Sequence, residues 1–195
     1  MSRPKLHRSN PVCQPKTMPI ASLFRRGRQR RAVAAAYRAI AERARDPAFF
    51  LDWGVPDTFD GRFELLALHA FLVLSRLKAE HARTAAFSQD LFDTMFADLD
   101  RAMREMGATD VGVGRYVKAM GRGFYGRIVA YERGVAEGDG TLADALRRNL
   151  FGTTEPREGA VAAAAAYLRR QAAALAAAPV VQLLAGEVPF LPAGG

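Results

Sequence analysis

The run FELLALHAFLVLSRL, residues 63–77, constrains the fold more than any other stretch of this chain. In its first twelve residues only Glu64 and His69 carry strongly polar side chains. A helix that is apolar on every side is either covered by other helices or lies in a bilayer. A bilayer span needs ~20 apolar residues, and charges stand close by at Arg62 and Arg76, so the run is too short to cross one. We therefore expect a buried helix wrapped by its neighbours.

The chain as a whole predicts an all-α fold. It shows no strand alternation and no internal repeat, and 195 residues are enough for one hydrophobic core and a tail. We expect a single multi-helix domain, residues 25–195, around a central apolar helix at about 61–79. An alanine-rich helix over 156–178 is the last long element. A disordered basic arm, residues 1–24, precedes the domain.

Spacing of apolar residues predicts the other helices. It places them over residues 25–45, 88–106 and 113–135, with a short helix at Pro47 between the first of these and the central helix. Thr58 or Asp60 is the expected N-cap of the central helix. Thr141 is the expected N-cap of a further short helix that ends near Asn149.

Glycines interrupt the helix over 113–135 in an unusual cluster. Gly121 to Gly126 matches G-x-G-x-x-G, but the dinucleotide fingerprint needs a preceding strand, which this chain lacks. Each glycine inside a helix costs ~1 kcal/mol relative to alanine. The cluster, which includes Gly134, therefore indicates that another backbone or a ligand approaches this helix closely.

Positive charge is concentrated at the N-terminus. Residues 1–46 hold twelve Lys/Arg and two Asp/Glu, whereas residues 47–195 hold sixteen and eighteen. The basic arm is expected to favour an anionic surface such as RNA, the ribosome or acidic lipid headgroups, and a merely solvated tail is the alternative. It lacks interleaved aromatics for base stacking, so any RNA binding would be led by the backbone and sensitive to salt. No specific DNA binding is expected. The arginines that would carry this contact are Arg25, Arg26, Arg28, Arg30 and Arg31.

The N-terminal segment carries few targeting signals. Residues 1–31 have no continuous apolar stretch of the kind that a signal peptide needs, and Met18 is a plausible alternative start. The lone Cys13 rules out an internal disulfide and fits a reducing compartment. We expect a cytoplasmic protein that is peripheral on the inner membrane in a bacterium, or one on the matrix side in a mitochondrion.

No residue pattern points to catalysis or to a metal. His7, His69 and His81 lack metal-binding spacing, no serine stands in a nucleophile elbow, and Cys13 lies in the arm. The sequence therefore predicts no enzyme, no metal and no cofactor. His69 is expected to be a core or rim histidine bonded to a carboxylate, with a partner contact as the alternative.

Three motifs follow one another along the chain. They are WGVPDTFDGRFELL at 53–66, leading into His69 and Arg76-Leu77; LFDTMFADLDRAMREMG at 91–107 with VGVGRYVK at 111–118; and GFYGR at 123–127 with Tyr131 and then LADALRRN at 142–149. Together they resemble the ubiquinol–cytochrome c chaperone family over roughly residues 47–152. The chain departs from the pattern at Arg62, where an aromatic residue would precede Phe63.

The resemblance implies a non-enzymatic, all-helical chaperone. Members assist assembly of the ubiquinol–cytochrome c reductase, complex III of the respiratory chain, and handle newly made cytochrome b. In mitochondrial members this work is linked to the ribosome and to a small partner protein. The expected partner is therefore cytochrome b or another reductase subunit. The alternative function is an RNA- or ribosome-binding translation factor that acts through the basic arm.

The client is expected to bind in a groove between the central helix and the glycine-bearing helix. The expected contacts are Asp57, Thr58, Phe59 and His69 near one end and Arg104, Arg115, Lys118, Tyr125 and Arg127 along the other wall. Four methionines either line the groove or fill the core, namely Met95, Met103, Met106 and Met120. A lipid or quinone pocket beside residues 121–126 is a further alternative.

Overall fold

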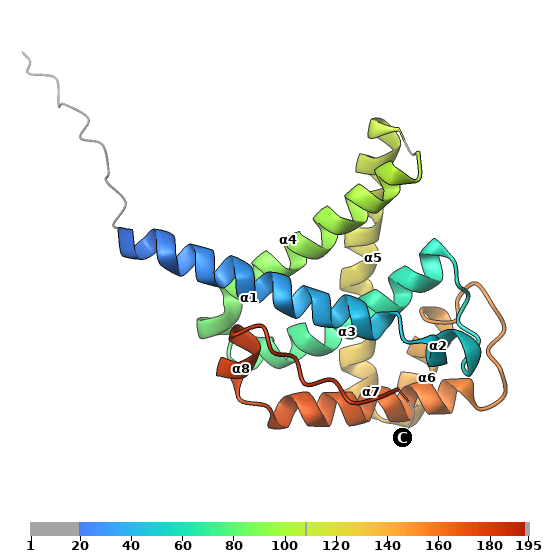
Figure 1. Ribbon diagram of the computed structural model, residues 1–195. Helices are drawn as coiled ribbons and strands as arrows, with labels where there is room; N and C mark the ends of the chain where they lie inside the picture. The colour runs from blue at the N-terminus through green and yellow to red at the C-terminus, as the bar shows by residue number, and fades with distance from the viewer. Residues whose placement is uncertain (1–19, 108, 194–195) are drawn as a thin grey trace, which may run out of the picture.

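The computed structural model describes residues 20–107 and 109–193 (Figure 1). Within these residues it holds eight α-helices and no strand, which confirms the all-α prediction. The helices are α1 (Ile20–Ala44), α2 (Pro47–Leu51), α3 (Phe59–Lys78), α4 (His81–Glu105), α5 (Asp110–Glu137), α6 (Asp139–Arg148), α7 (Ala160–Ala177) and α8 (Val180–Leu184).

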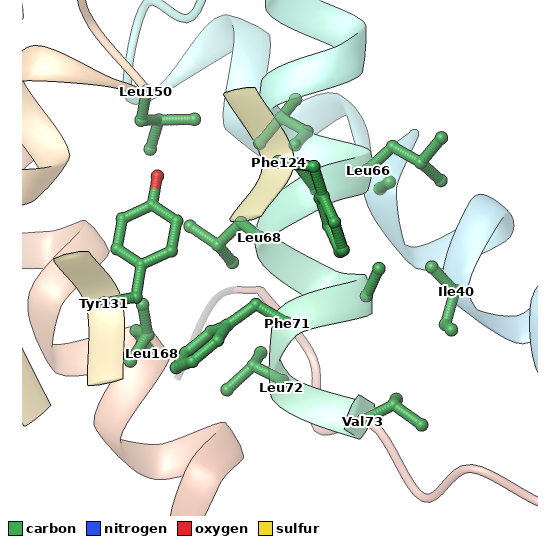
Figure 2. Packing of buried hydrophobic residues seen from close by; sticks show 14 of the residues in the cluster. Ile40, Leu66, Leu68, Phe71, Leu72, Val73, Phe124, Tyr131, Leu150 and Leu168 are labelled. Carbon is green, nitrogen blue, oxygen red and sulfur yellow. The ribbon is translucent and has the colours of Figure 1, made fainter. Parts of the chain in front are cut away.

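Helix α3 is the predicted central helix. Thr58 is its N-cap, with the Oγ accepting a hydrogen bond from Gly61 N at 3.2 Å. Gly61 packs directly against the Pro56 carbonyl, so no larger residue fits there. The helix is surrounded by α1, α4, α5 and α7, and its side chains enter the core on several sides (Figure 2).

Helices α4 and α5 join at a tip that projects from the rest of the molecule, and below it the two helices diverge and pack on the body (Figure 1). Helix α4 begins at His81, not at Ser88 as predicted. Its first turns are held by the buried Thr84, whose hydroxyl donates to the Leu77 carbonyl at 2.7 Å, and by the buried Phe87. Gly107, with φ of 87°, turns the chain at the tip.

The glycine cluster of α5 predicts that another backbone or a ligand approaches this helix closely. The structure shows such an approach by another backbone at one position, Gly134. A Cβ on Gly134 would lie 2.7 Å from Leu142 Cα, because α6 packs directly on the α5 backbone there. A Cβ on Gly126 would meet nothing within 4 Å. Helix α6 begins at Asp139, so Thr141 is not its N-cap; the Thr141 hydroxyl donates to the Glu137 carboxylate at 3.4 Å instead.

The C-terminal segment closes the other side of α3. Helix α7 starts at Ala160, four residues later than predicted, and lies against α3. The fully buried Gln171 holds the tail down, since its amide accepts from Leu191 N at 3.0 Å and donates to Leu191 O at 2.8 Å. Gly186, with φ of 91°, lets the tail touch the α1 backbone at Ala32.

Helix α1 begins at Ile20, so part of the predicted arm is helical. The expected arm covers residues 1–24, of which 1–19 lie outside the described residues. Residues 20–24 already belong to α1, and so do the five arginines at 25–31 that were expected in or beside a disordered segment. Among the described residues, no helix combines the length and apolar character that a bilayer crossing requires.

Candidate functional site

A hollow of about 330 Å³ opens between α1, α3 and α4, and we call it the α1–α3–α4 hollow. Its apolar lining consists of Ala41, Ala44, Phe59, Phe63, Leu66, Leu99, Ala102 and Met106. Its polar lining consists of Tyr37, Arg45, Arg62, Asp98 and Glu105. An apolar cavity with a few polar groups at its rim is the usual form of a binding site.

Small side chains create this hollow. Ala41 and Ala44 lie one turn apart on α1, and Ala102 lies opposite on α4. Because alanine fills little volume, the three helices leave space above Phe63 and Leu66 of α3. Backbone packing therefore makes the depression, while larger apolar side chains form its floor.

The polar rim is organised by hydrogen bonds. Tyr37 on α1 donates to the Asp98 carboxylate at 2.7 Å, and Arg101 pairs with the same carboxylate. Burial acts to raise the pKa of Asp98, but these two hydrogen bonds outweigh it and lower the pKa. The carboxylate is therefore charged at neutral pH and fixes the Tyr37 ring at the edge of the hollow.

Exposed apolar side chains continue the hollow toward the α4–α5 tip. Met106 lines the hollow and is 61% exposed. Phe59 lies with its ring centroid 6.1 Å from that of Tyr116 on α5, and the Tyr116 hydroxyl donates to Asp60 at 2.7 Å. Burial and this hydrogen bond raise the pKa of Tyr116 to about 12. An elongated apolar segment would find a continuous surface from the hollow to Tyr116.

The predicted site residues do not come together at one place. Phe59 lines the hollow, and Asp57 reaches it through an ion pair with Arg62 at 2.6 Å. Thr58 caps α3. Arg104 ties the α4–α5 tip together by pairing with Asp100 and Asp110, and does not line the hollow.

The expected groove between α3 and α5 is not where these residues lie. Arg127 of α5 closes the contact instead, because its guanidinium pairs with the buried Glu64 of α3, with Nε 2.6 Å from Oε2. Burial raises the pKa of Glu64, and the Arg127 guanidinium opposes that shift. The guanidinium also lies 5.3 Å from the centroid of the Phe63 ring. Arg127 thus joins α5 to α3, and its side chain is half-buried.

His69 is a core residue, the first of its two expected roles, and its complete burial leaves no surface for the partner contact that was the alternative. It is fully buried; Nδ1 donates to the Leu65 carbonyl at 2.7 Å, so Nε2 accepts from the Tyr167 hydroxyl at 2.8 Å. Burial lowers the pKa of His69 to about 4, so the ring is neutral. Its polar partner is a tyrosine from α7, not the expected carboxylate.

The remaining predicted residues share one outward face of α5. Arg115, Lys118 and Tyr125 are exposed, and Arg122 and Val129 continue the same stripe at spacings of three and four residues. The Tyr125 ring is 58% exposed and lies 5.6 Å from that of Phe92 on α4. This stripe lies apart from the α1–α3–α4 hollow, which no residue of α5 lines.

The four methionines divide between core and surface. Met95, Met103 and Met120 are buried, so they fill the core. Met106 alone among them is exposed and borders the hollow. Of the two expected roles, core filling therefore applies to the three buried methionines, and lining a binding surface applies to Met106.

Sequence reasoning missed most of the hollow. It named Phe59 and, as an alternative to core filling, Met106, but no residue of α1 in the hollow, because only the arginines at 25–31 of that helix were assigned a part in binding. The available signal was the pair Ala41 and Ala44 on the buried side of α1, and it was weak since alanine is frequent throughout this chain. Arg62, the one departure from the family pattern, stands at the rim.

A second hollow of about 290 Å³ lies between α3, α5 and α7 at the other end of α3. It is lined mainly by apolar residues, including Phe71, Leu72 and Val135, and by none of the predicted site residues. No residue of 121–126, where a ligand pocket was expected, lines it; its α5 residues, Glu132 and Val135, lie further along that helix. Among the described residues, no group of three or more His, Cys, Asp or Glu side chains is placed to hold a metal ion.

Comparison with known proteins gives one family. A family model described as "Ubiquinol-cytochrome C chaperone" matches residues 51–190. The "Ubiquinol-cytochrome c reductase complex assembly factor 1" of Drosophila melanogaster is 27% identical over 153 residues, which are 76% of this chain and 59% of the fly protein. "Protein CBP3, mitochondrial" of Saccharomyces cerevisiae is 35% identical over 109 residues, which are 53% of this chain and 32% of the yeast protein. The chain therefore spans less than two thirds of the length of these two relatives.

A solved structure extends the likeness to three dimensions. The crystal structure of the Cbp3 homolog from Brucella abortus matches with a TM-score of 0.79 and 35% sequence identity. The match covers 90% of this chain and 98% of the Brucella chain. Unlike the curated relatives, that chain has nearly the same extent as the one described here.

Proposed function

This chain belongs to the ubiquinol-cytochrome C chaperone family, and from that premise we propose that it is a non-enzymatic assembly factor for the ubiquinol–cytochrome c reductase. Its client is a hydrophobic segment of newly made cytochrome b. It holds this segment in the α1–α3–α4 hollow until the segment joins the complex. It acts on the cytoplasmic face of a bacterial inner membrane, or on the matrix side in a mitochondrion.

The hollow is the observation that carries this proposal. It is apolar at its floor, open to the surface and continued by the exposed Met106. A methionine can adapt its shape to different apolar partners, which suits a protein that binds an unfolded segment. The depression has the width of a few side chains, so it fits a helix or an extended strand entering side on.

The charges at the rim give the client an orientation. Asp98 and Glu105 stand on the α4 side, and Arg45 and Arg62 stand on the α1 and α3 side. Charges of opposite sign across an apolar floor favour a segment whose own polar ends match them. Such charges contribute more to register than to affinity, which the apolar floor supplies.

Photo-crosslinking tests the proposal. A photoreactive amino acid at Ala102, on the wall of the hollow, is expected to crosslink cytochrome b in cells of the native host. The same amino acid at Ala97, which is exposed on another side of α4, is the matched control and should give little product. Equal capture of cytochrome b at both positions, or capture only at Ala97, would show that the hollow is not the binding place.

Filling the hollow is expected to block the client while leaving the fold intact. Ala102→Met places three more heavy atoms in the space without removing any contact. We expect less assembled reductase and unchanged cytochrome b transcript, whereas Ala97→Met should behave as wild type. Deletion of the gene should have the larger effect. Normal reductase in the deletion strain would rule out the assembly function itself.

A further inference from the structure

A second surface lies at the far end of α1 from the hollow. Here Arg28, Arg83 and Val181, from α1, α4 and α8, border one shallow hollow of about 350 Å³. Phe24 and Arg31 lie on the same side of α1 as Arg28, at spacings of four and three residues. We call these five residues the α1–α8 patch, and Figure 1 shows that the three elements meet at one end of the molecule.

The patch combines exposed apolar side chains with positive charge. Phe24 is 75% exposed and Val181 is 61% exposed, which is unusual for large apolar residues. Arg28 and Arg31 are exposed and form no ion pair with any described residue; Arg26 and Arg30 are exposed too, but at two residues from Arg28 they face away from this side of the helix.

Acidic residues do little to neutralise this charge. Helix α1 has no Asp or Glu before Glu42. Glu80 accepts from Arg83 at 2.7 Å and also pairs with Arg76, while Asp90 accepts from the Gln29 amide at 2.6 Å. Arg83 of the patch is therefore already paired with Glu80, and the unpaired charge of the patch comes from Arg28 and Arg31, with which no described acidic side chain forms an ion pair.

We propose that the α1–α8 patch docks the protein on a membrane that contains anionic phospholipid. Arg28 and Arg31 would bind the lipid phosphates, and Phe24 and Val181 would enter the interface between headgroups and acyl chains. An apolar side chain beside basic residues is the pattern of interfacial membrane binding. An RNA surface is less favoured, because Phe24 offers a single stacking ring and an aliphatic Val181 offers none.

Vesicle binding by the full chain tests this proposal. We expect binding to vesicles of equal parts phosphatidylglycerol and phosphatidylcholine, and much weaker binding to pure phosphatidylcholine. Each basic residue near an anionic surface strengthens binding about fivefold, so Arg28→Gln/Arg31→Gln should weaken it about 25-fold. Phe24→Ala should weaken it about tenfold, because full burial of such a side chain is worth roughly 10- to 150-fold and an interface buries the ring only in part.

A matched charge control separates the patch from net charge. Arg115→Gln/Arg122→Gln removes the same two charges from the exposed stripe of α5 and should change binding by less than about threefold, since distant charges are screened. An equal loss in both double variants would overturn the proposal. Unchanged binding of Arg28→Gln/Arg31→Gln, with its helicity intact by circular dichroism, would also overturn it.

Two more outcomes contradict a lipid partner. Equal binding to neutral and anionic vesicles would remove the role of the arginines. Tight binding of a single-stranded RNA through Arg28 and Arg31, with no vesicle binding, would make the patch a nucleic-acid surface. The patch shares no residue with the α1–α3–α4 hollow, so either proposal can fail while the other stands.

Discussion

A neutral histidine sealed in the core makes the stability of this protein depend on pH. The ring of His69 has both nitrogens hydrogen-bonded, to Leu65 and Tyr167, and is surrounded by the rings of Phe49 and Phe190. Protonation would put a hydrogen on Nε2, which now accepts the hydrogen bond from the Tyr167 hydroxyl. His69 therefore binds a proton more weakly in the folded state than in the unfolded state.

The sign of the effect follows from the two pKa values. Burial lowers the pKa of His69 from 6.5 in the unfolded chain to about 4 in the folded one. Stability from this residue is complete above pH 6.5 and is lost as the pH falls toward 4. Between pH 7 and pH 5 the free energy of unfolding should fall by about 2 kcal/mol on this account.

Urea unfolding of wild type and His69→Gln at both pH values measures this contribution. The variant is expected to be less stable at pH 7, because it loses the ring packing. Its free energy of unfolding should, however, change with pH by about 2 kcal/mol less than that of wild type. All other titrating groups act equally in both proteins. The same pH dependence in both would mean that His69 is not buried as described.

At the scale of elements, the α5–α6 contact requires a glycine at one position only. Alanine at Gly134 would place a Cβ 2.7 Å from Leu142 Cα, and backbone cannot move aside cheaply. We expect Gly134→Ala to lower the free energy of unfolding by about 1–2 kcal/mol, after the gain in helix propensity. Gly126→Ala, in the same helix but facing open space, should raise it by up to about 1 kcal/mol.

Urea denaturation of the two alanine variants checks this pair. Opposite signs are expected, with both proteins remaining helical by circular dichroism. Stabilisation by Gly134→Ala would contradict the close packing of α6 on α5. Destabilisation by Gly126→Ala would contradict the open space that the structure shows beside Gly126.

Elements with a strong apolar pattern could be predicted, and the contacts between them could not. Helix α3 was predicted within two residues of its start because its side chains are apolar on all sides. The first turns of α4 were missed because the run HARTAA shows no apolar spacing; the buried hydroxyl of Thr84 holds them through a bond to α3. Local sequence does not report such a distant partner.

The candidate site was harder to predict than the helices, for a physical reason. A hollow arises where small residues of different helices face one another, and Ala102 of α4 faces Ala41 and Ala44 of α1 only in the folded molecule. Other alanines, such as Ala164 of α7, are fully packed. The pairing of His69 with Tyr167 has the same origin, since 98 residues separate the two in the chain.

At the scale of the whole molecule, two proposed surfaces share one helix without sharing residues. The α1–α3–α4 hollow uses Ala44 near the end of α1, and the α1–α8 patch uses Arg28. Arg28 and Ala44 are sixteen residues apart, about 24 Å at 1.5 Å per residue. The nearest pair, Arg31 of the patch and Tyr37 of the hollow, is six residues apart, about 9 Å. Changes this far apart should be independent.

Combining the variants tests that independence. Ala102→Met is expected to bind anionic vesicles within about twofold of wild type, because the patch is untouched. Its effect on the free energy of unfolding should add to that of Arg28→Gln/Arg31→Gln within about 0.5 kcal/mol. Thermal and urea unfolding of the single and combined variants measure this. A strong deviation from additivity would reveal coupling along α1.

Helix α1 also sets how far a client must travel. With its arginine-bearing end resting on lipid, the opposite end stands off by no more than about 24 Å. An extended chain advances about 3.3 Å per residue, so a tether of roughly eight residues bridges that gap. A client segment joined to its membrane spans by shorter loops could not reach the hollow while those spans stay in the bilayer. A segment joined by longer loops could reach it.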